Sequence, residues 1–199
     1  MNLRAKAPRR FKLTTDSRHS FPIVENRLDR QFAVDAPDKV WAADISYVWT
    51  YEGWLYLAVV MDLYSRRIVG WAMNKWIKTN LVLDALTMAY WQRKPSAGLL
   101  HHSDRGSQYA SYEYQIRLEQ YGMIPSMSRK GNCWDNAPIE RFFCSLKSER
   151  LSACRFATRN AAKNEIVDYI TYYNSIRLHS YLGYVPSIDY EKEQYAKAA

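Results

Sequence analysis

Residues 41–49 read WAADISYVW, and the alternation in this stretch decides the fold class. Every second residue from 41 to 49 is apolar, so these side chains would share one face of a β-strand. Asp44 and Ser46 fall on the opposite face. Aspartate is disfavoured in the middle of a strand. The stretch therefore predicts a strand with one apolar face and a carboxylate on the other.

The neighbouring segments extend this strand into a sheet. Residues 54–61 are apolar on both faces, as in a covered central strand, and a third strand is expected at 67–72. Helical periodicity follows at about 79–94, where Thr79 or Asn80 would cap the helix, and at 111–121, 136–151 and from 159 onward. Short strands are expected at 99–101 and 123–127, the last at a sheet edge because it contains Pro125. This order predicts an α/β fold: a mixed five-stranded sheet with flanking helices.

The composition is that of a basic globular protein. Of the 199 residues, 48% are hydrophobic, and 28 basic against 20 acidic side chains give a net charge of +8. Such a charge favours polyanionic partners, above all nucleic acid, although a solvated basic tail is the alternative. We expect a basic arm or linker at 1–36, a catalytic core at 37–190 and a tail at 191–199.

Several classes of protein are excluded by simple patterns. The longest apolar run, residues 54–61, is far shorter than the roughly 20 residues of a membrane helix, so no membrane partner is expected. The basic start has no apolar segment behind it and is not a secretory signal. The three cysteines contain no C-x-x-C pair, which indicates a reducing cytoplasm and neither disulfides nor structural zinc.

Three acidic residues are candidates for a shared site. Asp44 lies within the first strand, Asp104 directly follows a short apolar strand, and Glu140 lies in the first turn of a helix. Each has an ordinary alternative, as an edge charge, a turn residue and a helix-dipole partner respectively. If the strands bearing Asp44 and Asp104 are neighbours, the two carboxylates meet at one end of the sheet, and Glu140 can be brought over them.

Three clustered anions repel one another unless a cation lies between them. Oxygen ligands without thiolate or imidazole partners favour Mg²⁺ or Mn²⁺ over zinc. Two such ions about 4 Å apart can activate an attacking oxygen and stabilise a leaving oxygen at phosphorus. We therefore expect Asp44, Asp104 and Glu140 to be the ligands of two metal ions in a phosphoryl-transfer site.

Longer motifs surround these residues. Residues 41–47 (WAADISY) resemble the W-x-x-D-I-T/S-Y segment of bacterial insertion-sequence transposases with a retroviral-integrase-like core. Residues 102–109 (HSDRGSQY) resemble their H-S-D-x-G-x-Q-Y segment, and 126–137 (SMSRKGNCWDNA), 140–143 (ERFF) and 146–149 (LKSE) resemble the third block. The 35 residues between Asp104 and Glu140 equal the family's separation. The resemblance covers roughly residues 35–190.

The resemblance implies a ribonuclease H-like fold with Asp44, Asp104 and Glu140 as the catalytic carboxylates. It implies hydrolysis at the ends of the mobile element, followed by transfer of the freed 3′-hydroxyl into target DNA, without a covalent protein–DNA intermediate. The expected partners are element-end and target DNA and a second protomer or higher oligomer. A helix-turn-helix protein from a first reading frame is a further candidate partner. The expected location is the bacterial cytoplasm, associated with the nucleoid.

DNA contacts are expected at five further positions. Lys147 lies two helical turns after Glu140 and could meet a phosphate, or be an ordinary exposed lysine. Arg129 and Lys130 lie in a loop before the helix, and Arg177 and His179 face DNA or pack helices. His101, His102 and Tyr109 are expected near the metals but outside the chemistry.

Two departures from the family pattern stand out. About 40 residues precede Asp44, too few for the helix-turn-helix region that family members usually carry, so a truncated frame or an isolated core is expected. Pro186 and Ser187 are swapped relative to the usual Y-x-S-P. Alternatives to an active transposase are therefore a DNA-binding remnant that regulates a complete enzyme, and a nuclease that hydrolyses without joining.

Overall fold

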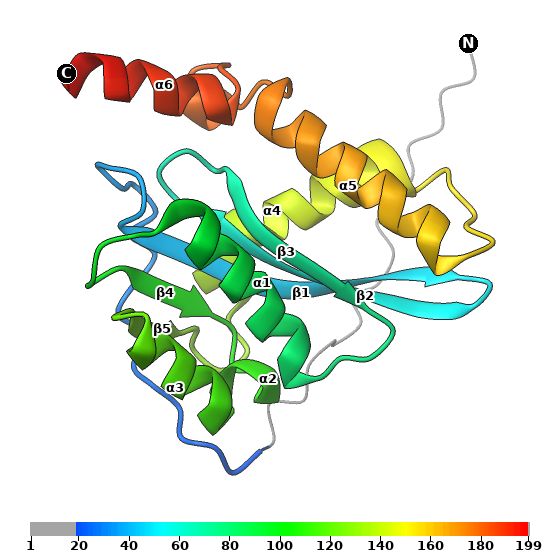
Figure 1. Cartoon of the computed structure of the whole chain (residues 1–199), viewed down its shortest axis with the longest axis horizontal. Helices are drawn as coiled ribbons and strands as arrows, with labels where there is room; N and C mark the ends of the chain where they lie inside the picture. The colour runs from blue at the N-terminus through cyan, green and yellow to red at the C-terminus, as the bar shows by residue number, and fades with distance from the viewer. Residues whose placement is uncertain (1–18, 199) are drawn as a thin grey trace.

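The computed structural model, which describes residues 19–198, contains one five-stranded mixed sheet (Figure 1). The strand order is β3-β2-β1-β4-β5, with β1 at Val40–Thr50, β2 at Gly53–Asp62, β3 at Ile68–Asn74, β4 at Leu100–Ser103 and β5 at Ile124–Met127. The first three strands are antiparallel, whereas β4 runs parallel to β1 and β5 parallel to β4. The predicted mixed sheet is thereby confirmed, with β5 and its proline at the edge.

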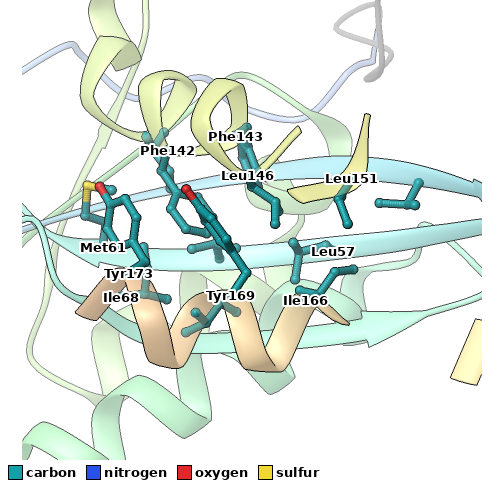
Figure 2. Packing of buried hydrophobic residues seen from close by; sticks show 14 of the residues in the cluster. Leu57, Met61, Ile68, Phe142, Phe143, Leu146, Leu151, Ile166, Tyr169 and Tyr173 are labelled. Carbon is teal, nitrogen blue, oxygen red and sulfur yellow. The ribbon is translucent and has the colours of Figure 1, made fainter. Parts of the chain in front are cut away.

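Helices cover both faces of the sheet. One face carries α1 (Thr79–Arg93), α2 (Ser107–Ala110) and α3 (Tyr112–Gln120), and the other carries α4 (Ala137–Ser145) and α5 (Arg159–Ser175). The alternation of β1 explains this arrangement: Trp41, Ala43 and Ile45 are buried towards α1, and Ala42 and Val48 towards α4 and α5. Figure 2 shows the hydrophobic cluster on the sheet face that α4 and α5 cover. In it, Phe142, Leu146, Ile166 and Tyr169 pack together with β2 residues.

Three expectations about helices need correction or addition. The N-cap of α1 is Lys78, whose extended backbone precedes the helix and whose side chain makes no capping bond; neither Thr79 nor Asn80 caps it. The helix that follows Asn136 continues beyond α4 as a π-helical turn, η2 (Leu146–Leu151). A further helix, α6 (Ser187–Ala198), crosses the boundary expected at residue 190.

The segment before β1 follows the core without regular secondary structure. Leu28 is buried, and its backbone N–H donates to Ser126 Oγ at 3.2 Å. Further along the surface, the His19 ring contacts the Arg105 carbonyl oxygen at 2.8 Å. The basic stretch 1–12 of the expected arm lies outside the described residues. No described helix combines the length and apolarity needed to cross a bilayer.

Hydrogen bonds and ion pairs attach α6 to the connection between β2 and β3 and to the end of α1. The carboxylate of Glu191, 3% exposed, accepts hydrogen bonds from Arg93 at 2.9 Å, Arg67 at 2.7 Å and Ser65 at 2.6 Å. Arg93 also donates to Asp38 at 2.9 Å. Burial raises the pKa of Glu191, but hydrogen bonds from Arg93 and Ser65 outweigh it, so its pKa lies below the usual value. This network fixes the C-terminal helix to the core.

Gly70 is a position where any side chain should destabilise the fold. A Cβ atom there would lie 2.3 Å from the Ala85 carbonyl oxygen and 2.7 Å from the Ala89 Cβ atom, and backbone cannot move aside cheaply. We expect Gly70→Ala to cost about 3 kcal/mol, the upper end of ordinary overpacking, measured by urea unfolding. Gly98→Ala is a poor comparison because of its positive φ. Ala72→Gly on the same strand measures the cost of added backbone flexibility together with the loss of one partly buried methyl group. A Gly70→Ala chain as stable as the native one would contradict this close approach of α1 to β3.

Candidate active site

Strand pairing brings the first two carboxylates together. In the parallel β1–β4 ladder, Ala43 is opposite Ser103, so Asp44 and Asp104 follow at the same end of the two neighbouring strands. Asp44 Oδ1 accepts from the Ile45 N–H at 2.7 Å, and Asp104 Oδ1 accepts from the Gly106 N–H at 2.8 Å. The neighbouring-strand condition on which the sequence prediction depended is therefore met.

The third carboxylate is delivered by α4, whose start is attached to β1. Asn136 Nδ2 donates to the Ala43 carbonyl oxygen at 3.1 Å, directly before Asp44. Asn136 is the N-cap residue, as its position indicated, but its side chain makes no capping bond. This tether places the first turn of α4, and with it Glu140, on the face of β1 that carries Asp44.

Electrostatics link the three carboxylates. Burial raises the pKa of Asp44 well above its usual value, and the negative charges of Asp104 and Glu140 raise it further. Burial also raises the pKa of Glu140. The ionised form of Asp44 is therefore unfavourable without a nearby positive charge. A bound cation would supply that charge and stabilise the carboxylate.

The three carboxylates offer the oxygen ligands that a hard divalent cation prefers, although they do not all lie within binding distance of a single point. Within residues 19–198, no group of three His, Cys, Asp or Glu side chains is close enough together to hold a metal ion as it stands. The carboxylates nonetheless lie within electrostatic range of one another at one end of the sheet. Their oxygen atoms are the ligands that Mg²⁺ and Mn²⁺ prefer, so chemistry and charge fit such an ion.

Lys147 reaches this group from the π-helical turn η2. Partial burial lowers its pKa, while the negative charge of Asp44 acts in the opposite direction. Its Nζ atom lies 5.1 Å from the centre of the Tyr47 ring. Lys147 therefore lies beside the carboxylates, and its role as a phosphate contact stays a prediction.

The loop before α4 is organised by Asp135, which the sequence analysis missed. Its fully buried carboxylate accepts from Arg129 at 2.7 Å, from Arg30 at 2.9 Å and from Asn26 at 3.0 Å. Arg129 thus has a structural bond, which no local signal distinguished from a DNA contact. Lys130 is exposed in the same loop. Contacts of either residue with DNA stay predictions.

Arg177 and His179, the last two predicted DNA contacts, lie in different environments. Arg177 donates to both carboxylate oxygens of Glu149, at 2.7 and 3.0 Å. His179 is 5% exposed; its ring nitrogen contacts the Tyr173 carbonyl oxygen at 3.0 Å, and its ring packs against that of Tyr173. Of the two roles left open, the packing role is the one these contacts support for His179. A buried ring cannot reach DNA without rearrangement.

His101, His102 and Tyr109, which were expected near the metals, are buried in the core. Burial lowers the pKa of His101 to about 3 and of His102 to about 4, so both rings are neutral near pH 7. His102 contacts Ser126 and Ser128 through its two ring nitrogens, at 2.9 and 3.1 Å. Tyr109 is buried, and burial raises its pKa well above the usual value. These residues support the end of β4 beneath Asp104.

Comparisons with known proteins agree with this geometry. Two family models described as "Integrase core domain" match residues 34–133 and 140–195. A 31 kDa protein of insertion element IS600 from Shigella sonnei is 47% identical over 200 residues, covering 100% of this chain and 74% of that protein. Transposase InsF of insertion sequence IS3A from Escherichia coli K12 is 43% identical over 195 residues, covering 98% and 68%.

Solved structures support the fold at lower sequence identity. The HTLV-2 integrase catalytic core domain in complex with magnesium aligns with a TM-score of 0.58 and 18% identity, over 73% of this chain and 92% of that one. The BIV integrase catalytic core domain gives 0.56 and 15%, over 81% and 99%. The sheet order and flanking helices are accordingly those of the ribonuclease H-like integrase cores. The chain belongs to the IS3-family insertion-element transposases that carry an integrase core domain.

Proposed function

We propose that this chain is the catalytic core that cuts the phosphodiester at the ends of its element and joins the resulting 3′-hydroxyl to target DNA. The observation that carries the proposal is the grouping of Asp104 and Glu140 around the half-buried Asp44, whose pKa both of them raise. Such an accumulation of negative charge costs folding free energy and is expected where it serves metal-dependent chemistry.

Each residue has a role within this proposal. Asp44, Asp104 and Glu140 would hold two Mg²⁺ or Mn²⁺ ions, with Glu140 carried to the aspartates by α4, whose start is tethered to β1 through Asn136. When bound, the two ions supply a nucleophilic oxygen and stabilise the leaving oxygen. Lys147 would contact a phosphate beside the carboxylates, and Lys130 and Arg129 would contact the DNA backbone from their loop.

Partners and place of action follow from the same assignment. The proposed substrates are element-end and target DNA, and the proposed assembly is a dimer or higher oligomer, since two element ends must be held together. A helix-turn-helix partner from a first reading frame would supply recognition of those ends. Relatives from Shigella sonnei and Escherichia coli support action in a bacterial cytoplasm, at the nucleoid.

Glu140→Gln should separate chemistry from binding. We expect the native chain, with Mn²⁺ or Mg²⁺, to resolve a branched oligonucleotide that mimics a strand-transfer product, and Glu140→Gln to do so about 10²-fold more slowly because it lacks one anionic ligand. Glu119→Gln, an exposed acid on α3, is the matched control and should retain full activity. Gel separation of end-labelled products measures the rates.

Other outcomes favour the alternative functions. No resolution by a folded chain that binds the branched DNA would contradict the proposal and favour a DNA-binding regulator. Cleavage of flanked ends without any joining of supplied 3′-hydroxyl ends would favour a nuclease. Equal rates for the native chain and Glu140→Gln would show that Glu140 takes no part in the reaction.

A further inference from the structure

Three aromatic side chains, two exposed and one partly buried, form a group on the β1–β2 hairpin, which extends well beyond α1 in Figure 1. We call Tyr47, Trp49 and Trp54 the aromatic platform. Trp54 lies edge-to-face against both others, with ring centres 5.0 Å from Tyr47 and 4.8 Å from Trp49. The strand register places Trp49 directly opposite Trp54. The three rings are thus held by one another and by the hairpin backbone.

The platform is open to solvent. Trp49 is 56% exposed and Trp54 39% exposed, although tryptophan is among the largest apolar side chains. The hairpin itself is fixed: Thr50 Oγ1 donates to the Gly53 carbonyl oxygen at 2.7 Å, and Arg159 of α5 donates to the Trp54 carbonyl oxygen at 3.0 Å. Rings held in place with free faces lose little conformational entropy on binding a flat partner.

The platform is continuous with the carboxylate site. Lys147 Nζ lies 5.1 Å from the centre of the Tyr47 ring, and its charge acts on Asp44. Along the strand, Tyr47 and Trp49 follow Asp44 by about 10 and 17 Å. Asp44 and Tyr47 point to opposite faces, and the connection passes around the edge of β1, whose ladder with β4 ends at Ala43. A strand leaving the carboxylates would meet Lys147 first and the rings next.

We propose that the aromatic platform binds unpaired nucleotides of the DNA strand beside the site of phosphoryl transfer by stacking on their bases. The inference rests on the proposed function, in that DNA is the substrate. A cation next to exposed rings matches a phosphate next to a base, and the chain's net charge of +8 favours a polyanion. In a duplex the base faces are already stacked, so the platform selects single strands.

Trp49→Ala tests this inference on the full chain. Fluorescence anisotropy with a labelled thymidine oligonucleotide of about 20 nucleotides, in EDTA, should show binding about tenfold weaker than that of the native chain. Affinity for a duplex of the same length should change less than about twofold, because phosphate contacts dominate it. Trp49→Phe should restore most of the single-strand affinity, since it retains an aromatic face.

Trp91→Ala is the matched control. Trp91 is 63% exposed but lies near the end of α1, on another part of the molecule, so its loss should leave both affinities unchanged. Because Trp49 is exposed, its variant should keep the native melting temperature, which circular dichroism checks.

Three outcomes would overturn the inference: unchanged thymidine binding by Trp49→Ala, equal losses on single strand and duplex, or an equal effect of Trp91→Ala. If Trp49→Ala dissociated an oligomer in sedimentation experiments while thymidine binding stayed the same, the rings would be an interface between copies of this chain. Binding in EDTA requires no chemistry, so failure of the branched-substrate assay and failure of the platform are distinguishable.

Discussion

Changing Asp44 to asparagine is expected to lower metal-dependent phosphoryl transfer about 10³-fold while raising the thermal stability of the metal-free protein. The loss of activity follows from the central position of Asp44, whose ionisation both Asp104 and Glu140 oppose. A neutral amide cannot offer the anionic ligand that balances two divalent cations. The gain in stability follows because the same substitution removes a half-buried carboxylate that lies close to two like charges.

The direction of this change in stability follows from the change that folding makes to the pKa of Asp44. Folding raises the pKa of Asp44, first through burial and then through Asp104 and Glu140, so the charged form is less favourable in the folded chain than in the unfolded one. Stability of the metal-free native chain should therefore fall as pH rises from the unfolded pKa towards the folded pKa, and stay lower above both. Asp44→Asn lacks this contribution.

Thermal unfolding in EDTA across pH 4 to 8 measures the difference. Near neutral pH, Asp44→Asn should melt a few degrees higher, which corresponds to about 1 kcal/mol for a chain of this size. Added Mg²⁺ should stabilise the native chain and have little effect on the variant. A variant that melts lower than the native chain at every pH would contradict the account of Asp44 as a destabilising charge.

Replacing Glu191 by alanine should destabilise the fold by about 3 kcal/mol. The carboxylate accepts from Arg93 and Arg67, and its removal leaves the largely buried guanidinium of Arg93 with only aspartate partners. Burial raises the pKa of neighbouring Asp62 to about 7, so this aspartate is only partly ionised at neutral pH and compensates poorly.

Urea unfolding monitored by circular dichroism measures the loss, and Glu193→Ala is its control. Glu193 lies on the same helix but is exposed, so its removal should change stability by less than about 0.5 kcal/mol. The pKa of Glu191 is lowered in the folded chain, so its contribution should disappear as pH falls through that value. Equal stability of the two variants would show that α6 is held by its apolar contacts instead.

The sheet and the carboxylates could be predicted from sequence because their signals are local. Alternation along residues 41–49 identifies β1 and assigns Asp44 to the face opposite Trp41, and the two core clusters confirm that assignment. The helix expected from 159 onward is α5, and Thr158 caps it by accepting from the Ala161 N–H at 3.1 Å.

The supporting bonds could not be predicted, because they join residues far apart in the chain. Asn136 looked like an ordinary helix cap, yet its amide binds Ala43, 93 residues away. Arg129 binds Asp135 through its guanidinium, a contact that no local signal in the sequence indicated. His179 was compatible with either role until its burial was known. Polar side chains carry no periodicity, so only the tertiary structure identifies their partners.

The parallel ladder between β1 and β4 makes the carboxylate site a late product of protein synthesis and folding. It joins residues 40–43 to 100–103, with β2, β3 and α1 lying between them in the chain. Pairing across so long a loop forms slowly compared with local hairpins. Asp44 leaves the ribosome long before Glu140, so an incomplete nascent chain holds no assembled set of three carboxylates, and the proposed cutting of DNA would become possible only once nearly the whole core has been made.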